Sequence, residues 1–146
     1  MLEFVVYIKN PRYMNKTNDP NRETFEQSYR NFLNALEILA KNAEEQCHIM
    51  EWYNVAWELR DDISIGRYLL KISHQYLSDS QQNAIDDLLT EIEKLPEEIF
   101  SEAKTEKENL NSMRYALWDP IRAQANNLIK TLKPITVANE SFFETN

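Results

Sequence analysis

TFEQSYRNFLNALEILAKNAEEQ, residues 24–46, is the stretch that decides the fold class. Its apolar side chains recur every three or four positions, which is the spacing of one face of an α-helix. They are Phe25, Tyr29, Phe32, Leu36, Leu39 and Ala43. Pro20, Glu23 and Glu26 suit the start of such a helix. The pattern predicts a helix from Thr24 to about Gln46, whose apolar face other elements must cover.

The same spacing recurs downstream and predicts an all-α fold of five to seven helices in a single domain, residues 1–146. The next expected helix is Cys47–Asp62, either separate from the first or continuous with it. It is followed by helices from Arg67 to about Leu77 and over 79–95, the latter after an N-cap at Ser78. One helix is then expected to open at Pro96 and to continue through Ser101–Trp118, and a last one to run from Asp119-Pro120 to Pro134. The break at Ile63–Gly66 contains the only glycine. Leu110, Met113 and Leu117 are expected to face inward.

The two ends of the chain carry weaker patterns. Residues 1–23 are expected to form a short strand, Phe4–Ile8, followed by a loop, because β-branched and aromatic residues give way to asparagines and prolines. The tail, residues 135–146, is expected to be a loop or a short strand.

Composition excludes several classes of protein. One glycine in 146 residues rules out phosphate-binding loops that depend on glycine and makes hairpin-rich β folds improbable. The net charge of −8 disfavours an extended nucleic-acid surface. Cys47 is the only cysteine, so no intramolecular disulfide is possible and a reducing, cytoplasmic location is expected. No segment has the length and hydrophobicity of a membrane span.

The predicted helix Cys47–Asp62 is the candidate for binding. Apolar residues cover most of it and leave a narrow polar stripe, which consists of Glu51, Asn54, Glu58, Asp61 and Asp62. Such acids can simply cover a solvated face, or they can dock a basic partner, since acidic surfaces steer and orient association. Tyr53 and Trp57 beside the stripe favour docking, because aromatic anchors next to charge are common in interfaces. They can equally be core residues.

In size, acidity, helicity and the absence of a catalytic motif, the chain resembles the small acidic helical immunity proteins of bacterial toxin systems, including contact-dependent inhibition. The resemblance implies a non-enzymatic inhibitor that covers the active site of a basic cognate toxin, often a nuclease, and that needs no cofactor, metal, nucleic acid or membrane. The seven residues of the stripe and its aromatic neighbours would then contact the toxin.

Two other functions remain open. Arg67 and His74 lie nearly two helical turns apart, which resembles the Arg-x4–6-His motif of HEPN-type ribonucleases and would imply RNA cleavage. A structural or adaptor subunit is the second alternative.

Glu45 and His48 have the spacing of a di-iron ligand pair, but no second such pair exists, so no metal site is expected. Cys47 and His48, adjacent on a helix, point in different directions, and Cys47 is expected in the core.

Overall fold

The computed structural model describes residues 20–72 and 76–144. Every regular element within those ranges is a helix, which confirms the all-α class. The elements are α2 (Pro20–Leu39), α3 (Ala43–Ile49), α4 (Val55–Ile63), α5 (Ile65–Ile72), α6 (Asp79–Glu93), the 3₁₀ helix η2 (Glu97–Phe100), α7 (Glu106–Met113), α8 (Trp118–Thr131) and α9 (Lys133–Glu144). The expected strand Phe4–Ile8 lies outside the described residues.

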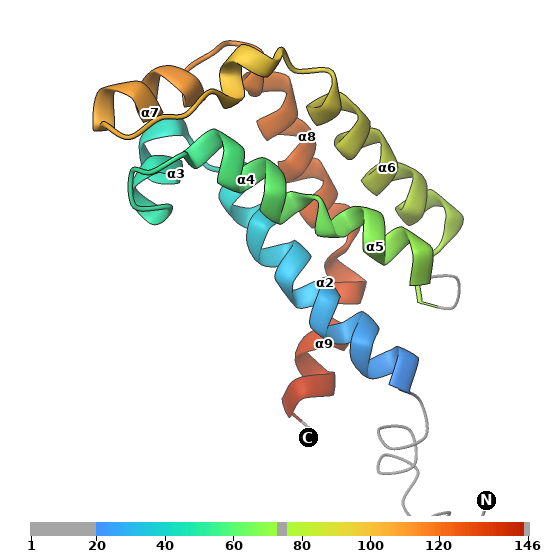
Figure 1. The fold of residues 1–146 in the computed structure, drawn as a ribbon. Coiled ribbons are helices and arrows are strands. Elements are labelled where there is room, and N and C mark those ends of the chain that lie inside the picture. Colours follow the sequence, from blue (N-terminus) through green and yellow to red (C-terminus); the bar gives the residue numbers. More distant parts are fainter. Residues whose placement is uncertain (1–19, 73–75, 145–146) are drawn as a thin grey trace, which may run out of the picture.

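Helix α2 forms the axis of the fold (Figure 1). It contacts α4 and α5, which follow one another along its length, as well as α8 and α9, while α6 packs against both α5 and α8. Its predicted apolar face is buried: Phe25, Tyr29, Phe32, Leu36 and Leu39 are each 2% exposed or less. The stretch that predicted the fold class therefore also supplies the centre of the core.

The predicted helix Thr24–Gln46 is wrong at both ends. The helix begins four residues earlier, at Pro20, and ends at Leu39, after which α3 starts a new direction. Asn42 causes this restart, because its side chain accepts a hydrogen bond from the Glu45 N–H while the Glu45 carboxylate accepts one from the Asn42 N–H. This reciprocal capping box makes a helix start more favourable than continuation through Lys41.

The predicted helix Cys47–Asp62 is also wrong, since a loop from Met50 to Asn54 separates α3 from α4. Glu51, Trp52 and Asn54 have φ values of 62°, 59° and 47°, a left-handed conformation that costs L-residues about 1–2 kcal/mol each. Tertiary hydrogen bonds hold it. The Asn54 N–H donates to the Ala103 carbonyl at 2.8 Å, and the Asn54 side chain accepts from the Ala103 N–H at 2.7 Å.

Buried Asn109 completes this anchor. Its amide nitrogen donates to the carbonyls of Trp52 (2.8 Å), Thr105 (2.8 Å) and Ala103 (3.1 Å), and its oxygen accepts from the Val55 N–H at 2.8 Å. The first turn of α4 is therefore placed by a side chain from α7, which no local pattern in residues 47–62 records.

The break predicted at Ile63–Gly66 is confirmed at Ser64, between α4 and α5. Gly66, however, lies within α5, and its role is close packing. A Cβ there would lie 2.8 Å from the Phe32 ring and 3.0 Å from the Leu89 side chain. The only glycine thus lets α5 approach both α2 and α6.

Other boundaries differ because local caps override the apolar pattern. The helix expected to open at Pro96 and continue to Trp118 is instead a single 3₁₀ turn, η2, followed by the separate helix α7, which Thr105 and Glu108 start with another capping box. Leu117 is 48% exposed and does not face inward. The helix expected over Arg67–Leu77 begins at Ile65 and ends at Ile72, before the undescribed residues 73–75.

The C-terminal region departs most from expectation. Helix α8 begins at Trp118, so Asp119 lies inside its first turn and is not its N-cap. Residues 135–144, expected as loop or strand, are helical in α9, with Pro134 in the first turn, where its missing N–H costs nothing. Tyr29 binds Thr136 through their hydroxyls at 2.7 Å, and this hydrogen bond joins α9 to α2.

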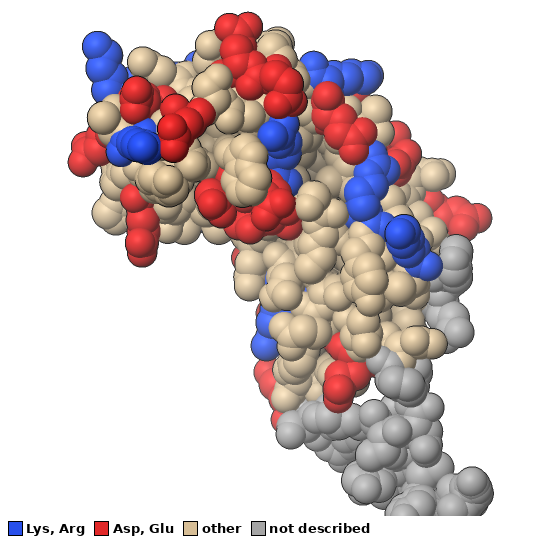
Figure 2. Space-filling view, in the orientation of Figure 1, with Lys and Arg blue, Asp and Glu red and all other residues tan. Residues whose placement is uncertain are grey.

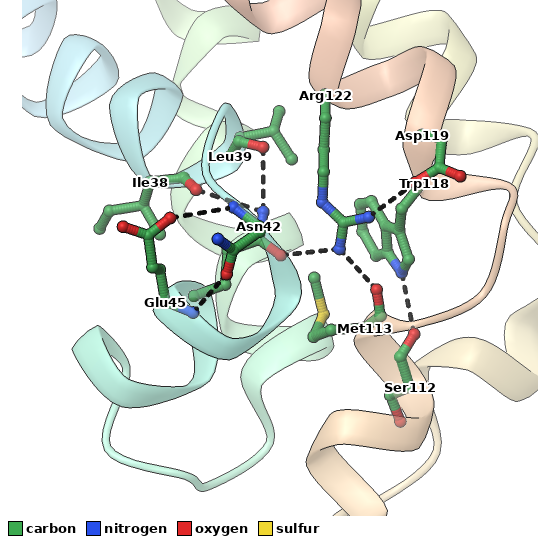
Figure 3. Close-up of polar contacts among 10 residues, drawn as sticks. Ile38, Leu39, Asn42, Glu45, Ser112, Met113, Trp118, Asp119 and Arg122 are labelled. Atoms are coloured by element: carbon green, nitrogen blue, oxygen red, sulfur yellow. Dashed lines mark hydrogen bonds and ion pairs between the residues drawn. The ribbon is translucent and has the colours of Figure 1, made fainter.

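A polar network fixes α3 between α2 and α8 (Figure 3). The amide nitrogen of buried Gln46 donates to the carbonyls of Leu39 at 2.9 Å and Ile38 at 3.2 Å. Its oxygen accepts from the Arg122 guanidinium at 2.8 Å, and Arg122 also donates to the Met113 carbonyl. These hydrogen bonds join α3 to the C-terminal end of α2 and to α8.

Candidate protein-interaction face

Three carboxylates of the predicted stripe remain together on α4. Glu58, Asp61 and Asp62 occupy positions i, i+3 and i+4 of one helix, which places them on a common face. Asp61 and Asp62 are exposed, and Glu58 is partly buried. Figure 2 shows acidic side chains gathered over α4. We call Glu58, Asp61 and Asp62 the acidic triad.

The acidic triad is not neutralised within the described part of the chain, where none of its members forms an ion pair. Partial desolvation, together with the nearby charges of Glu58 and Asp61, raises the pKa of Asp62 above its usual value. Ionisation of Asp62 is therefore opposed by its surroundings. A cation brought to this face would relieve that repulsion.

Exposed aromatic rings lie on α4 and on the loop before it. Trp57 is 43% exposed and Tyr53 is 49% exposed, so neither is a core residue. Tyr68 of α5, 44% exposed, is a third ring that the sequence did not single out as a binding residue. Only the fold places it near the triad, because Tyr68 and Asp62 line the same groove.

The remaining two members of the predicted stripe lie on the loop before α4. Glu51 is exposed, and Asn54 is partly buried with its side chain bound to the Ala103 N–H. Asn54 therefore anchors the loop, which leaves its amide oxygen less available to a partner. The stripe is a continuous helical feature only from Glu58 onward.

Two hollows lie on either side of the α4–α5 break. The first, the Trp57 hollow, has a volume of about 280 Å³, and Trp57, Ile63, Leu89 and Ile92 supply its apolar lining. The second, the Asp62 groove, has a volume of about 660 Å³ and runs between α2 and the α4–α5 break. Asp61 and Ser64 line both, so one wall separates them. Sequence reasoning missed this pair because its walls come from α2, α4, α5 and α6.

The cations near the Trp57 hollow are engaged by acids of the same chain. Arg60 donates to Glu97 at 2.9 Å and lies 3.8 Å from the centre of the Phe100 ring. Arg67 binds the carboxylates of both Asp86 and Glu93. Their positive charge is thus largely compensated.

The ion pairs of Arg67 also bear on the ribonuclease alternative. Hydrogen bonds to Asp86 and Glu93 raise the pKa of Arg67 and hold its guanidinium against α6. The second residue of that motif, His74, lies outside the described residues.

Cys47, Glu45 and His48 are the other potentially reactive side chains that the sequence singles out. Cys47 is fully buried, as expected, and burial raises the pKa of its thiol to about 11. Glu45 is held in the capping box with Asn42, and His48 is exposed. Among the described residues, no three His, Cys, Asp or Glu side chains are grouped as a metal site would require. Across residues 20–72 and 76–144, none of the helices combines the length and hydrophobicity needed to cross a membrane.

Comparison with protein-family models, curated proteins and solved structures finds no match for this chain. Function must therefore be argued from the face itself.

Proposed function

We propose that this chain is a non-enzymatic inhibitor that binds a basic protein through the α4–α5 face, in the manner of an immunity protein that covers the active site of a cognate toxin, such as a nuclease. The observation that carries the proposal is the unpaired acidic triad beside exposed Trp57. Charge selects and orients a basic partner, whereas an exposed aromatic ring supplies binding energy when it is covered.

Arrangement of the charges supports a protein partner of this kind. Some acids elsewhere in the described residues are matched internally, as in the pairs Arg60–Glu97 and Arg67–Asp86, and others, such as Asp87 and Glu140, form no ion pair. The acidic triad differs in placing three carboxylates without ion pairs on one face of one helix. The acidic triad has no compensating ion pair among residues 20–72 and 76–144, and the raised pKa of Asp62 shows that its ionisation is locally opposed. Such strain is tolerated where an opposite charge arrives on binding, and the active-site cleft of a nuclease carries that charge.

Affinity capture with three baits tests the proposal. The baits are the unaltered chain, the double variant Glu58→Lys/Asp61→Lys, and a control, Asp87→Lys/Glu140→Lys. The control makes the same change in net charge at exposed positions on α6 and α9 that form no ion pair within the described residues. The double variant is expected to lose at least tenfold in association rate with the captured partner at about 50 mM salt and less at about 200 mM, while the control binds normally. Circular dichroism checks that all three baits are folded.

Inhibition of the partner's activity is tested by a separate measurement. The captured partner, expressed alone, is expected to arrest growth or to cleave nucleic acid, and co-expression of the unaltered chain is expected to relieve that effect. A partner that binds the double variant and the unaltered chain equally well would contradict the role of the α4–α5 face. A partner whose activity continues in the complex would contradict inhibition.

A further inference from the structure

The two hollows beside the α4–α5 break differ in chemistry, although they share a wall. The Trp57 hollow has an apolar floor made by Leu89 and Ile92 of α6 and Ile63 of α4, all of them buried. Its volume of about 280 Å³ lies below the roughly 300–1,000 Å³ of typical small-molecule sites. It is large enough for a single apolar side chain.

The Asp62 groove, on the other side of the wall, carries more polar groups than the Trp57 hollow, although Ala35, Ile38 and Ile65 also line it. Asp61 and Asp62 contribute carboxylates, Asn31 and Asn34 of α2 contribute amides, and Tyr68 contributes a ring. Carboxylates and amide oxygens accept hydrogen bonds from ammonium and guanidinium groups, and an aromatic face attracts them. This groove suits a lysine or arginine side chain.

From this juxtaposition we propose that the α4–α5 break is a two-part receptor for one basic segment of a protein partner, in which an apolar side chain enters the Trp57 hollow and a neighbouring lysine or arginine enters the Asp62 groove. The inference rests on the proposed basic-partner function and deepens it by naming the partner's chemistry. Asp61 and Ser64 line both hollows, so adjacent side chains of one segment can reach both.

Charge complementarity supports this occupant over an apolar one. The cations on the wall of the Trp57 hollow, Arg60 and Arg67, are already bound to Glu97, Asp86 and Glu93, so they oppose a basic segment only weakly. Asp61 and Asp62 line the Asp62 groove, and neither forms an ion pair within the described residues. An aromatic anchor supplies binding energy when it is covered, and complementary charge beside it orients the partner.

Two synthetic peptides serve as probes. Both carry four lysines on each side of a central residue, which is phenylalanine in one and alanine in the other, so that their charges are identical. Binding is measured by fluorescence anisotropy at about 50 mM salt, where surface electrostatics is least screened. The unaltered chain is expected to bind the phenylalanine peptide at least fivefold more tightly than the alanine peptide.

Matched variants separate the two halves of the receptor. Trp57→Ala is expected to abolish the advantage of phenylalanine, whereas Tyr115→Ala, which removes another exposed ring, is expected to preserve it. Asp62→Asn is expected to weaken both peptides by a similar factor, and Asp87→Asn on α6 is expected to weaken neither.

The outcomes distinguish this inference from the proposed function. Equal binding of the two peptides, or an advantage of phenylalanine that survives Trp57→Ala, overturns the two-part receptor. If binding of both peptides still falls in Asp62→Asn, an acidic docking face remains supported. A different result would contradict the proposed function, namely a captured partner that binds the Glu58→Lys/Asp61→Lys variant as well as it binds the unaltered chain.

Discussion

Replacement of Asn109 by alanine should test how the candidate face is held in place. The fully buried Asn109 side chain bonds to the Val55 N–H and to the carbonyls of Trp52, Ala103 and Thr105. The last two carbonyls keep a second donor, from the backbone N–H groups of Asn54 and Asn109 respectively. In Asn109→Ala the N–H of Val55 and the carbonyl of Trp52 lose the partner that Asn109 provides.

A buried polar group left without a partner costs about 1–3 kcal/mol, and the buried Val55 N–H is such a group. The Trp52 carbonyl is only partly buried and can be hydrated, so it adds less, and the predicted loss in the free energy of unfolding is about 1–3 kcal/mol. Urea denaturation followed by circular dichroism measures it. The control is Asn111→Ala, two residues away on α7, where the side chain is exposed, and a change within about 0.5 kcal/mol is expected. A loss below about 1 kcal/mol in Asn109→Ala, or one equal to that of the control, would refute the assigned role of Asn109 as the anchor of the loop.

Three further predictions follow from single positions. Gly66→Ala is expected to cost about 1–3 kcal/mol by overpacking against Phe32 and Leu89, and an unchanged urea midpoint would show that the helices separate freely. The Cys47 thiol is expected to react with a thiol reagent at pH 8 only after unfolding, because it is buried and its pKa is raised to about 11; rapid labelling of the native chain would contradict this. Asp62→Asn is expected to raise the urea midpoint at neutral pH but not near pH 3. The raised pKa of Asp62 means that folding opposes its ionisation, so the native state loses stability as the pH rises from about 3.8 through the folded pKa, and below that range the carboxyl is protonated in both states. An equal effect of Asp62→Asn at both pH values would exclude charge repulsion as the cause.

Apolar spacing by itself determined the all-α class and the buried face of α2, although it missed the loop Met50–Asn54 and the helix α9. Phe25, Tyr29, Phe32, Leu36 and Leu39 of α2 all lie in the core, because a stripe every three or four residues can be covered only on one side. Spacing does not determine where a helix ends. The restarts at Asn42 and Thr105 depend on reciprocal side-chain caps, and the positions of those caps interrupt an apolar pattern that would otherwise continue.

The sequence also determined the composition of the candidate face but not its shape. Glu58, Asp61 and Asp62 share a face because helical geometry is local, so their grouping was predictable. The loop that precedes them was not, because its left-handed residues are stabilised by Asn109, more than fifty residues away in the chain. Likewise, the Trp57 hollow and the Asp62 groove exist only where α4 and α5 meet α6 and α2. Long-range packing brings those walls together, and the spacing of residues along the sequence does not record which distant helices come into contact.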